Sequence, residues 1–129
     1  MADEDLGRIF VVDDDEAVGR ALSRLLRSFG YAADAFHSAA QVMAQPLPAD
    51  LVCLVVDLRM PGEGGLELWE QLQAAGQDLP VVFVTAHGAS GLAHRALQVA
   101  PVLQKPVDGG ALTQAIRSVA RRPVRAARR

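Results

Sequence analysis

The chain has 129 residues, which is the size of one globular domain, and 50% of them are hydrophobic, so the disordered and fibrous classes are excluded. A single cysteine, Cys53, excludes a disulfide framework. The formal net charge is −2, and although six arginines lie between Arg117 and Arg129, we interpret them as a solvated tail rather than a nucleic-acid site.

The first predicted element is a strand over residues 8–12, a short β-favouring run that stops at acidic residues. A helix is predicted from Glu16 to the stop signal at Gly30. Its apolar positions recur at helical spacing and are Val18, Leu22, Leu25, Leu26 and Phe29. A strand over 32–36 and a short helix capped by Ser38 follow.

The middle of the chain repeats this alternation of strand and helix. Buried strands are predicted over 51–56 and 79–85, because both are continuous apolar runs. Between them a helix ends at Gly76, and its apolar positions are Leu66, Leu68, Trp69 and Leu72.

The last third contains a helix indicated by Leu92, Ala96 and Val99, then a short strand over 102–104. A final helix follows, and its apolar positions are Ala111, Leu112, Ala115, Ile116 and Val119. Five strand-then-helix units predict an α/β fold: a three-layer, doubly wound (βα)5 parallel sheet of the flavodoxin-like type.

The predicted organisation is one domain over residues 8–122, with an N-terminal extension over 1–7 and a basic C-terminal tail over 123–129. No apolar run approaches about 18 residues, so we expect a cytoplasmic protein that lacks a membrane segment.

Polar side chains are predicted to follow four strands at one edge of this sheet, because the carboxyl ends of parallel strands meet there. They are, in chain order, Asp13, Asp14, Asp15, Asp57, Thr85 and Lys105. Each alone is ordinary turn or strand-end chemistry, but their joint placement favours a function.

Asp13, Asp14 and Asp57 are candidate ligands for Mg²⁺. Converging carboxylates repel one another unless a hard cation lies among them, and Mg²⁺ prefers such oxygen ligands. Together with Lys105, this cation brings the cluster near neutrality, so that a phosphoryl oxygen is not repelled. A carboxylate beside Mg²⁺ and an ammonium suits attack on phosphorus, and Thr85 can donate a hydrogen bond to the acquired group.

Four motifs together resemble a known family. They are Val11-Val12-Asp13-Asp14-Asp15, Val56-Asp57-Leu58-Arg59-Met60-Pro61-Gly62 with Gly65, Val84-Thr85-Ala86-His87, and Lys105-Pro106. Over roughly residues 8 to 121 the sequence resembles the receiver domain of response regulators in two-component signalling. Its motif variants are similar to the subgroup that includes nitrogen-fixation regulators.

The resemblance implies a role for each matching residue. Asp57 would accept a phosphoryl group from the phosphohistidine of a histidine kinase or phosphotransfer protein. Asp14 would bind Mg²⁺ directly, Asp13 partly through water, and the backbone carbonyl of Arg59 would supply a further ligand.

The remaining roles and partners follow from the same resemblance. Thr85 would contact the phosphoryl group, Lys105 would pair with it, and the Lys105-Pro106 peptide bond would be cis. We expect no enzyme activity beyond self-phosphorylation and slow self-dephosphorylation. A homodimer through the fourth helix, fifth strand and fifth helix is a further expectation, whereas direct DNA binding is not expected.

Two departures from the family pattern affect the expected output. Val102 stands where the family usually has an aromatic residue three positions before its lysine, and the stretch from Thr85 to Lys105, which contains Pro101, is about two residues short. We therefore predict normal phosphorylation with an altered output at the fourth helix and fifth strand.

Three alternatives stay open at this point. A degenerate receiver would bind partners without phosphorylation. A metal-dependent phosphohydrolase would normally have a second acid two residues after its nucleophile, and Arg59 stands at that position. A metal site at His87 and His94 lacks cysteine or acid partners, so solvated positions are the favoured interpretation. His37 is interpreted as a helix-entry residue.

Overall fold

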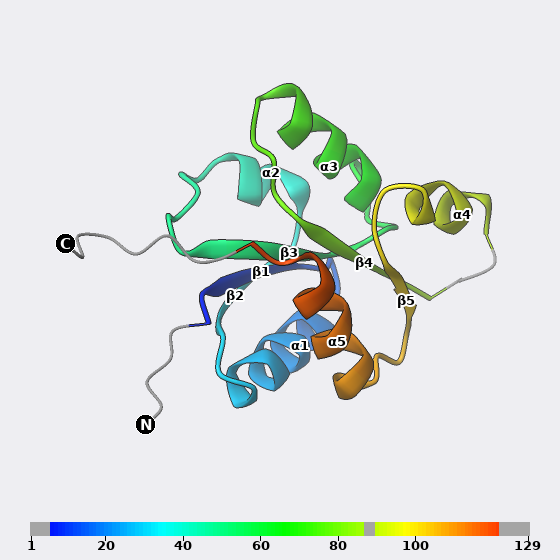
Figure 1. Ribbon diagram of the computed structural model, residues 1–129. Helices are drawn as coiled ribbons and strands as arrows, with labels where there is room; N and C mark the ends of the chain where they lie inside the picture. Colours follow the sequence, from blue (N-terminus) through cyan, green and yellow to red (C-terminus); the bar gives the residue numbers. More distant parts are fainter. Residues whose placement is uncertain (1–5, 87–89, 122–129) are drawn as a thin grey trace.

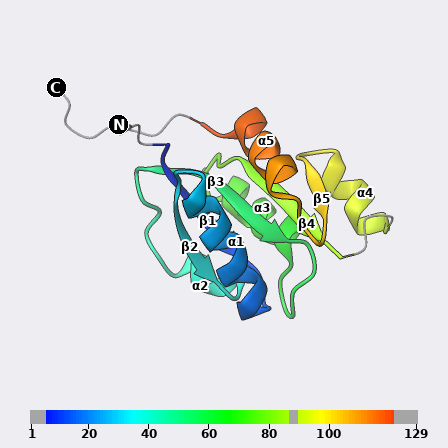
Figure 2. The same ribbon diagram turned by 90° about the horizontal axis from the view of Figure 1, so that it is seen from below.

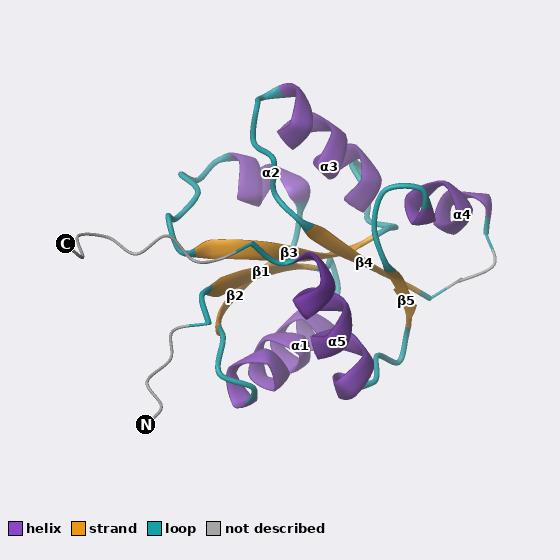
Figure 3. Cartoon of the chain, viewed as in Figure 1, coloured by secondary structure: helices purple, strands orange, loops and turns teal. Residues whose placement is uncertain are grey.

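The computed structural model describes residues 6–86 and 90–121, which form one five-stranded parallel sheet between two layers of helices (Figures 1 and 3). The elements are β1 (Arg8–Val12), α1 (Glu16–Ser28), β2 (Ala32–Phe36), α2 (Ala39–Met43), β3 (Leu51–Asp57), α3 (Gly65–Ala74), β4 (Val81–Thr85), α4 (Gly91–Leu97), β5 (Val102–Gln104) and α5 (Gly109–Val119). The strand order is β2-β1-β3-β4-β5, and every pair is parallel. The predicted (βα)5 fold class is confirmed.

Two apolar layers lie on opposite faces of the sheet, because successive side chains of a strand point to opposite faces. On one face Val11 packs in a cluster with Leu26 of α1 and Ile116 of α5. On the other face Val12 belongs to a cluster with Leu68 of α3, and α2 and α4 complete that layer. Figure 2 shows α1 and α5 together on one side of the sheet.

Helix boundaries follow the capping and stop signals of the sequence. The Asp15 side chain caps α1 by accepting hydrogen bonds from the backbone N–H groups of Ala17 and Val18, and Ser38 caps α2 in the same way. Gly30 and Gly76 follow α1 and α3 with φ of 102° and 80°, a region that favours glycine.

Three predicted boundaries differ from the structure. Strand β3 ends at Asp57 rather than at residue 56. Strand β4 begins at Val81 rather than at residue 79, because Pro80 has no backbone N–H to donate to the ladder. Helix α4 ends at Leu97, so Val99 lies beyond it and is 43% exposed. Pro101 accounts for the early end, since a residue before proline disfavours the helical region.

Residues 1–5 of the predicted extension and the whole predicted tail lie outside the described residues, so these domain limits stay predictions. Within 6–86 and 90–121, no helix is both long and apolar enough to cross a bilayer.

Candidate functional site

The strand register brings the predicted polar side chains to one edge of the sheet. Val12 is the neighbour of Val56 across β1 and β3, so the residues that follow them, Asp13 and Asp57, lie side by side. Asp57 in turn is the neighbour of Val84 on β4. Thr85 therefore ends β4 next to the acids, in the place that the sequence predicts.

Lys105 connects two of the acids. Its Nζ lies 2.9 Å from Oδ2 of Asp57 and 2.9 Å from Oδ2 of Asp13. The two aspartates are only 6% and 1% exposed, so the ammonium offsets part of the free-energy cost of burying two carboxylates. The Lys105 ammonium stabilises Oδ2 of Asp13 as an ion pair, while Oδ1 of Asp13 accepts the backbone N–H of Asp15 at 2.9 Å.

The Asp57 carboxylate is held through both of its oxygens. Oδ2 accepts a hydrogen bond from Lys105 Nζ, and Oδ1 accepts the backbone N–H of Arg59 at 3.1 Å. Burial raises the pKa of Asp57 above its ordinary value of 3.8, the two hydrogen bonds act in the opposite direction, and the charge of Asp13 adds to the rise. The net pKa is raised, which marks this carboxylate as functionally unusual.

The Lys105 ammonium stays protonated in this setting. Burial works to lower its pKa, but the neighbouring Asp13 and Asp57 carboxylates outweigh that effect, and the pKa is raised above its ordinary value of 10.5. A fixed positive charge therefore faces the buried acids throughout the physiological range.

A third acid, Asp14, completes a cluster that suits a metal ion. Carboxylate oxygens of Asp13, Asp14 and Asp57 all lie within 4.8 Å of one another, and Asp14 is exposed whereas the other two are buried. One ammonium leaves this cluster with excess negative charge, and its all-oxygen donor set matches a hard divalent cation such as Mg²⁺. The site opens to solvent on the side of Asp14.

Thr85 and the Lys105-Pro106 turn form the other wall of the site. Thr85 is buried at the end of β4, and its carbonyl accepts the backbone N–H of Lys105 at 2.8 Å. The predicted cis Lys105-Pro106 bond is confirmed. Arg59 supplies its N–H to Asp57, while a ligand role for its carbonyl stays a prediction.

The comparison with protein families agrees with this geometry. A family model described as the response regulator receiver domain matches residues 9–117. The chain belongs to the response regulator receiver family. The predicted recognition is therefore confirmed, and with it the assignment to two-component signalling.

Several relatives of this receiver are regulators from bacteria. It is 41% identical to the transcriptional regulatory protein FixJ of Azorhizobium caulinodans, over 85% of this chain and 53% of that protein. It is 36% identical to the response regulator protein TodT of Pseudomonas putida, over 85% of this chain and 49% of that protein. The solved response regulator StyR is similar with a TM-score of 0.77 and 42% identity, over 86% of this chain and 57% of that one.

The receiver spans about half the length of the curated relatives it matches. The likeness to the FixJ protein also confirms the predicted subgroup of nitrogen-fixation regulators.

Two features of the receiver site were not predicted from the sequence. Gly64 and Gly65 pack against the end of β3. A Cβ added at Gly64 would lie 2.2 Å from the carbonyl oxygen of Leu58, and one added at Gly65 would lie 2.6 Å from the carbonyl oxygen of Asp57. Asp15, grouped with the site acids by its position, instead caps α1. The first feature depends on contacts between segments, whereas the N-cap spacing before Glu16 is a signal for the second.

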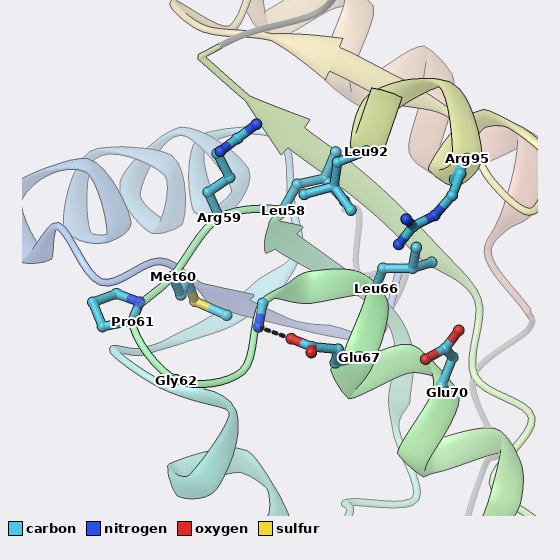
Figure 4. Close-up of a pocket in the computed structure, with 11 residues that line it drawn as sticks. Leu58, Arg59, Met60, Pro61, Gly62, Leu66, Glu67, Glu70, Leu92 and Arg95 are labelled. Atoms are coloured by element: carbon cyan, nitrogen blue, oxygen red, sulfur yellow. Dashed lines mark hydrogen bonds between the residues drawn. The ribbon is translucent and has the colours of Figure 1, made fainter. Parts of the chain in front are cut away.

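A pocket of about 490 Å³ lies beside the loop between β3 and α3 of the receiver (Figure 4). It lies between the β3–α3 loop, α3 and α4, and Arg95 and Leu92 of α4 face it from one side. The Glu67 side chain accepts the backbone N–H of Gly64 at 2.8 Å and closes the first turn of α3.

Neither His37 nor His94, the two histidines that the structure describes, takes part in the receiver's acid cluster. His94 is exposed on α4, and among the residues that the structure describes the grouping that could hold a metal contains only aspartates. His87 lies outside the described residues. His37 donates its backbone N–H to Gln41 Oε1 at 2.7 Å, which agrees with a helix-entry position before α2.

Proposed function

We propose that Asp57 accepts a phosphoryl group from a histidine kinase or phosphotransfer protein and thereby switches the protein–protein contacts of this receiver. The observation that carries the proposal is the Lys105 ammonium lying 2.9 Å from both buried aspartates, with Asp14 at the open side of the same cluster. Family membership supports the signalling role.

The chemistry requires an Asp57 oxygen to form a bond to phosphorus as the bond from phosphorus to the donor imidazole breaks. The imidazole nitrogen keeps the bonding electron pair and takes up a proton. Because both Asp57 oxygens accept hydrogen bonds, the attacking oxygen must give one of them up, and the Lys105 ammonium can then follow the new phosphoryl oxygens.

The neighbouring residues complete the proposed acceptor. Asp13, Asp14 and Asp57, with the carbonyl of Arg59, would hold Mg²⁺, which supplies positive charge to the phosphoryl oxygens when bound. The hydroxyl of Thr85, at the end of the adjacent strand, would donate a hydrogen bond to the phosphoryl group. These roles suit self-phosphorylation and slow self-dephosphorylation rather than turnover of a separate substrate.

Acetyl phosphate tests the proposal without knowledge of the kinase. With Mg²⁺, the wild-type protein should gain the mass of one phosphoryl group, whereas Asp57→Ala and the wild-type protein in EDTA should not. An equal gain in Asp57→Ala would contradict the proposal, and no gain in any sample would favour a receiver that binds partners unphosphorylated. Sustained hydrolysis of small phosphate esters would instead indicate a phosphohydrolase.

We also propose that the output of this receiver differs from the usual one. Val102 is partly buried and packs in the same cluster as Leu92 of α4 and Ala100, so a short β-branched side chain occupies the place of the family's aromatic residue. The carbonyl of Pro101 accepts the N–H of Phe83 at 2.9 Å, which fixes the entry to β5. Neither feature provides a large side chain that could rotate on phosphorylation.

Backbone chemical shifts with and without a beryllofluoride phosphoryl mimic test the altered output. Changes should be large around Asp57 and Thr85 and small over α4, β5 and the start of α5. A full rearrangement of that surface would contradict the proposal, and a concentration-dependent increase in mass would support a homodimer through it.

The wider setting is proposed from the relatives and the residues together. One relative is named a transcriptional regulatory protein, so we propose that this receiver controls an output carried by a joined or separate partner rather than contacting DNA itself. We propose that the receiver domain covers residues 8–122. We also propose that the protein lies in the cytoplasm, because the buried thiol of Cys53 is unpaired in the described residues and suits a reducing compartment.

A further inference from the structure

A second pocket lies on the α1 side of the sheet, separate from the acid cluster. It has a volume of about 210 Å³ and is lined by Arg20, Ser23, Arg24 and Arg27 of α1 and by Ala35 of β2. Strand β2 forms one edge of the sheet, and α1 runs beside it (Figure 2). Ser23 is buried whereas the three arginines and Ala35 are exposed, so the serine lies at the inner end.

The Ser23 hydroxyl is unsatisfied within the described part of the chain. The residue is 1% exposed, and its Oγ has no hydrogen-bond partner there. Two other helical serines behave differently, since Ser28 and Ser118 each donate to a backbone carbonyl at 2.6 Å. A buried polar group without a partner is uncommon, and here it lines a pocket.

Three arginines line the same pocket as this hydroxyl, and none of the lining residues is acidic. Their spacing along α1 places them on one face of the helix. Arg27 Nη2 donates a 3.0 Å hydrogen bond to the Ala33 carbonyl. Arg20 Nη1 lies 3.7 Å from Oε1 of Glu16, which is exposed. Arg24 forms no ion pair with any described residue, so no carboxylate in direct contact offsets its charge there.

The size of the pocket limits what it can take. Pockets for drug-sized ligands measure about 300–1,000 Å³, so about 210 Å³ is too small to enclose a nucleotide. It suits a single phosphate group, whose oxygens accept from both guanidinium and hydroxyl donors.

We propose that this pocket binds a small tetrahedral oxyanion, either inorganic phosphate or the phosphate of a small ester. Ser23 would donate its hydroxyl proton at the inner end, while Arg20, Arg24 and Arg27 would supply charge at the opening. The proposal does not depend on phosphorylation of Asp57, because no residue is shared between the two sites.

Titration of the ¹⁵N-labelled protein with inorganic phosphate tests the proposal at constant ionic strength and without Mg²⁺, so that the acid cluster does not contribute. Saturable shifts are expected at the amides of residues 20–27 and at Ala35. Arg24→Gln should weaken binding by about tenfold, the scale of one charge-assisted hydrogen bond. Arg95→Gln, an exposed arginine on α4, is the matched control and should leave binding unchanged.

Ser23→Ala separates a binding role from a structural one. The inference predicts weaker phosphate binding without a lower thermal midpoint, since the hydroxyl has no partner to lose among the described residues. Glycerol phosphate and inorganic phosphate in parallel titrations distinguish the two sources, and binding of either supports the site. Shifts that do not saturate, equal losses in Arg24→Gln and Arg95→Gln, or acetate binding as well as phosphate would overturn the proposal.

Discussion

Asp57 is a buried carboxylate with a second buried acid, Asp13, beside it. One ammonium serves both, because Lys105 Nζ lies 2.9 Å from each. Burial raises the pKa of Asp57 and the charge of Asp13 adds to the rise, so the pKa stays raised even though Lys105 and the Arg59 N–H both act to lower it. Two buried carboxylates with one ammonium between them leave excess negative charge, so a bound cation should stabilise the site.

Asp57→Asn should increase the free energy of unfolding in the absence of metal. Because the folded pKa of Asp57 lies above 3.8, the folded state holds this proton more tightly, and ionisation costs stability as the pH rises through that range. The gain should therefore be small near about pH 4 and larger at about pH 7. Urea unfolding in EDTA at both pH values measures it.

Asp78→Asn, at an exposed position between α3 and β4, is the control and should change stability by less than about 0.5 kcal/mol. A lower free energy of unfolding for Asp57→Asn at neutral pH would show that the buried charge is stabilising instead.

Strand-end chemistry was the most predictable part of the site. Asp13, Asp57 and Lys105 each follow a recognisable apolar strand, and parallel topology then forces them to one edge. The bridging position of the Lys105 ammonium was not predictable, since it depends on side-chain geometry between three strands. The unsatisfied hydroxyl of Ser23 was not predictable either, because the spacing of apolar residues along a helix does not reveal whether a serine hydroxyl forms a hydrogen bond.

At the scale of elements, the connection from β3 to α3 packs closely against the end of β3. Gly65 begins α3 directly against the end of β3, and an added Cβ would lie 2.6 Å from the Asp57 carbonyl oxygen and 2.9 Å from Cγ1 of Val56. Glycine therefore allows the helix to start close to Asp57.

Gly65→Ala should destabilise the fold by about 1–3 kcal/mol, the usual cost of forcing extra volume into a packed region. Gly91→Ala is the matched control, because Gly91 begins α4 and an added Cβ there would have no atom of a described residue within 4 Å apart from its chain neighbours. There the substitution should be neutral or stabilising by up to about 1 kcal/mol. Urea unfolding measures both variants, and equal stabilities would contradict the packing described here.

Element boundaries were predictable where a residue acts locally and uncertain where packing decides. Gly30 and Gly76 ended their helices as predicted, because a positive φ is a property of the residue itself. Val99 was assigned to a helix by its spacing, but α4 ends before it. The periodicity of apolar residues does not reveal where a following proline stops the helix.

On the scale of the whole molecule, β3 is the central strand and both of its faces are covered. All seven of its residues are buried, and Cys53 belongs to the cluster formed with α1 and α5. Burial raises the pKa of the Cys53 thiol to about 12, so the reactive thiolate is scarce in the folded state.

Cys53 should react with a thiol reagent only when the whole sheet unfolds. The free energy obtained from its labelling rate should equal that from urea unfolding, because no smaller opening exposes a central strand. Ser118→Cys in a Cys53→Ala background is the control and should label immediately, since Ser118 is exposed on α5. Labelling of native Cys53 at a similar rate would show that the core opens locally.

The layered architecture was predictable from the alternation of strands and helices, whereas the output surface was not. Both apolar layers follow from right-handed crossovers and two-sided burial, whereas the strand order β2-β1-β3-β4-β5 comes from the structure. The effect of Val102 depends on how α4 packs on β5, which a single sequence does not specify.

Borohydride reduction of the phosphorylated protein tests the central claim most directly, because it converts an aspartyl phosphate to homoserine. After treatment with acetyl phosphate and Mg²⁺, peptide sequencing by mass spectrometry should find homoserine at position 57 and at no other aspartate. Homoserine at Asp13 or Asp14, or none despite a gain in mass, would contradict the account of Asp57 as the acceptor.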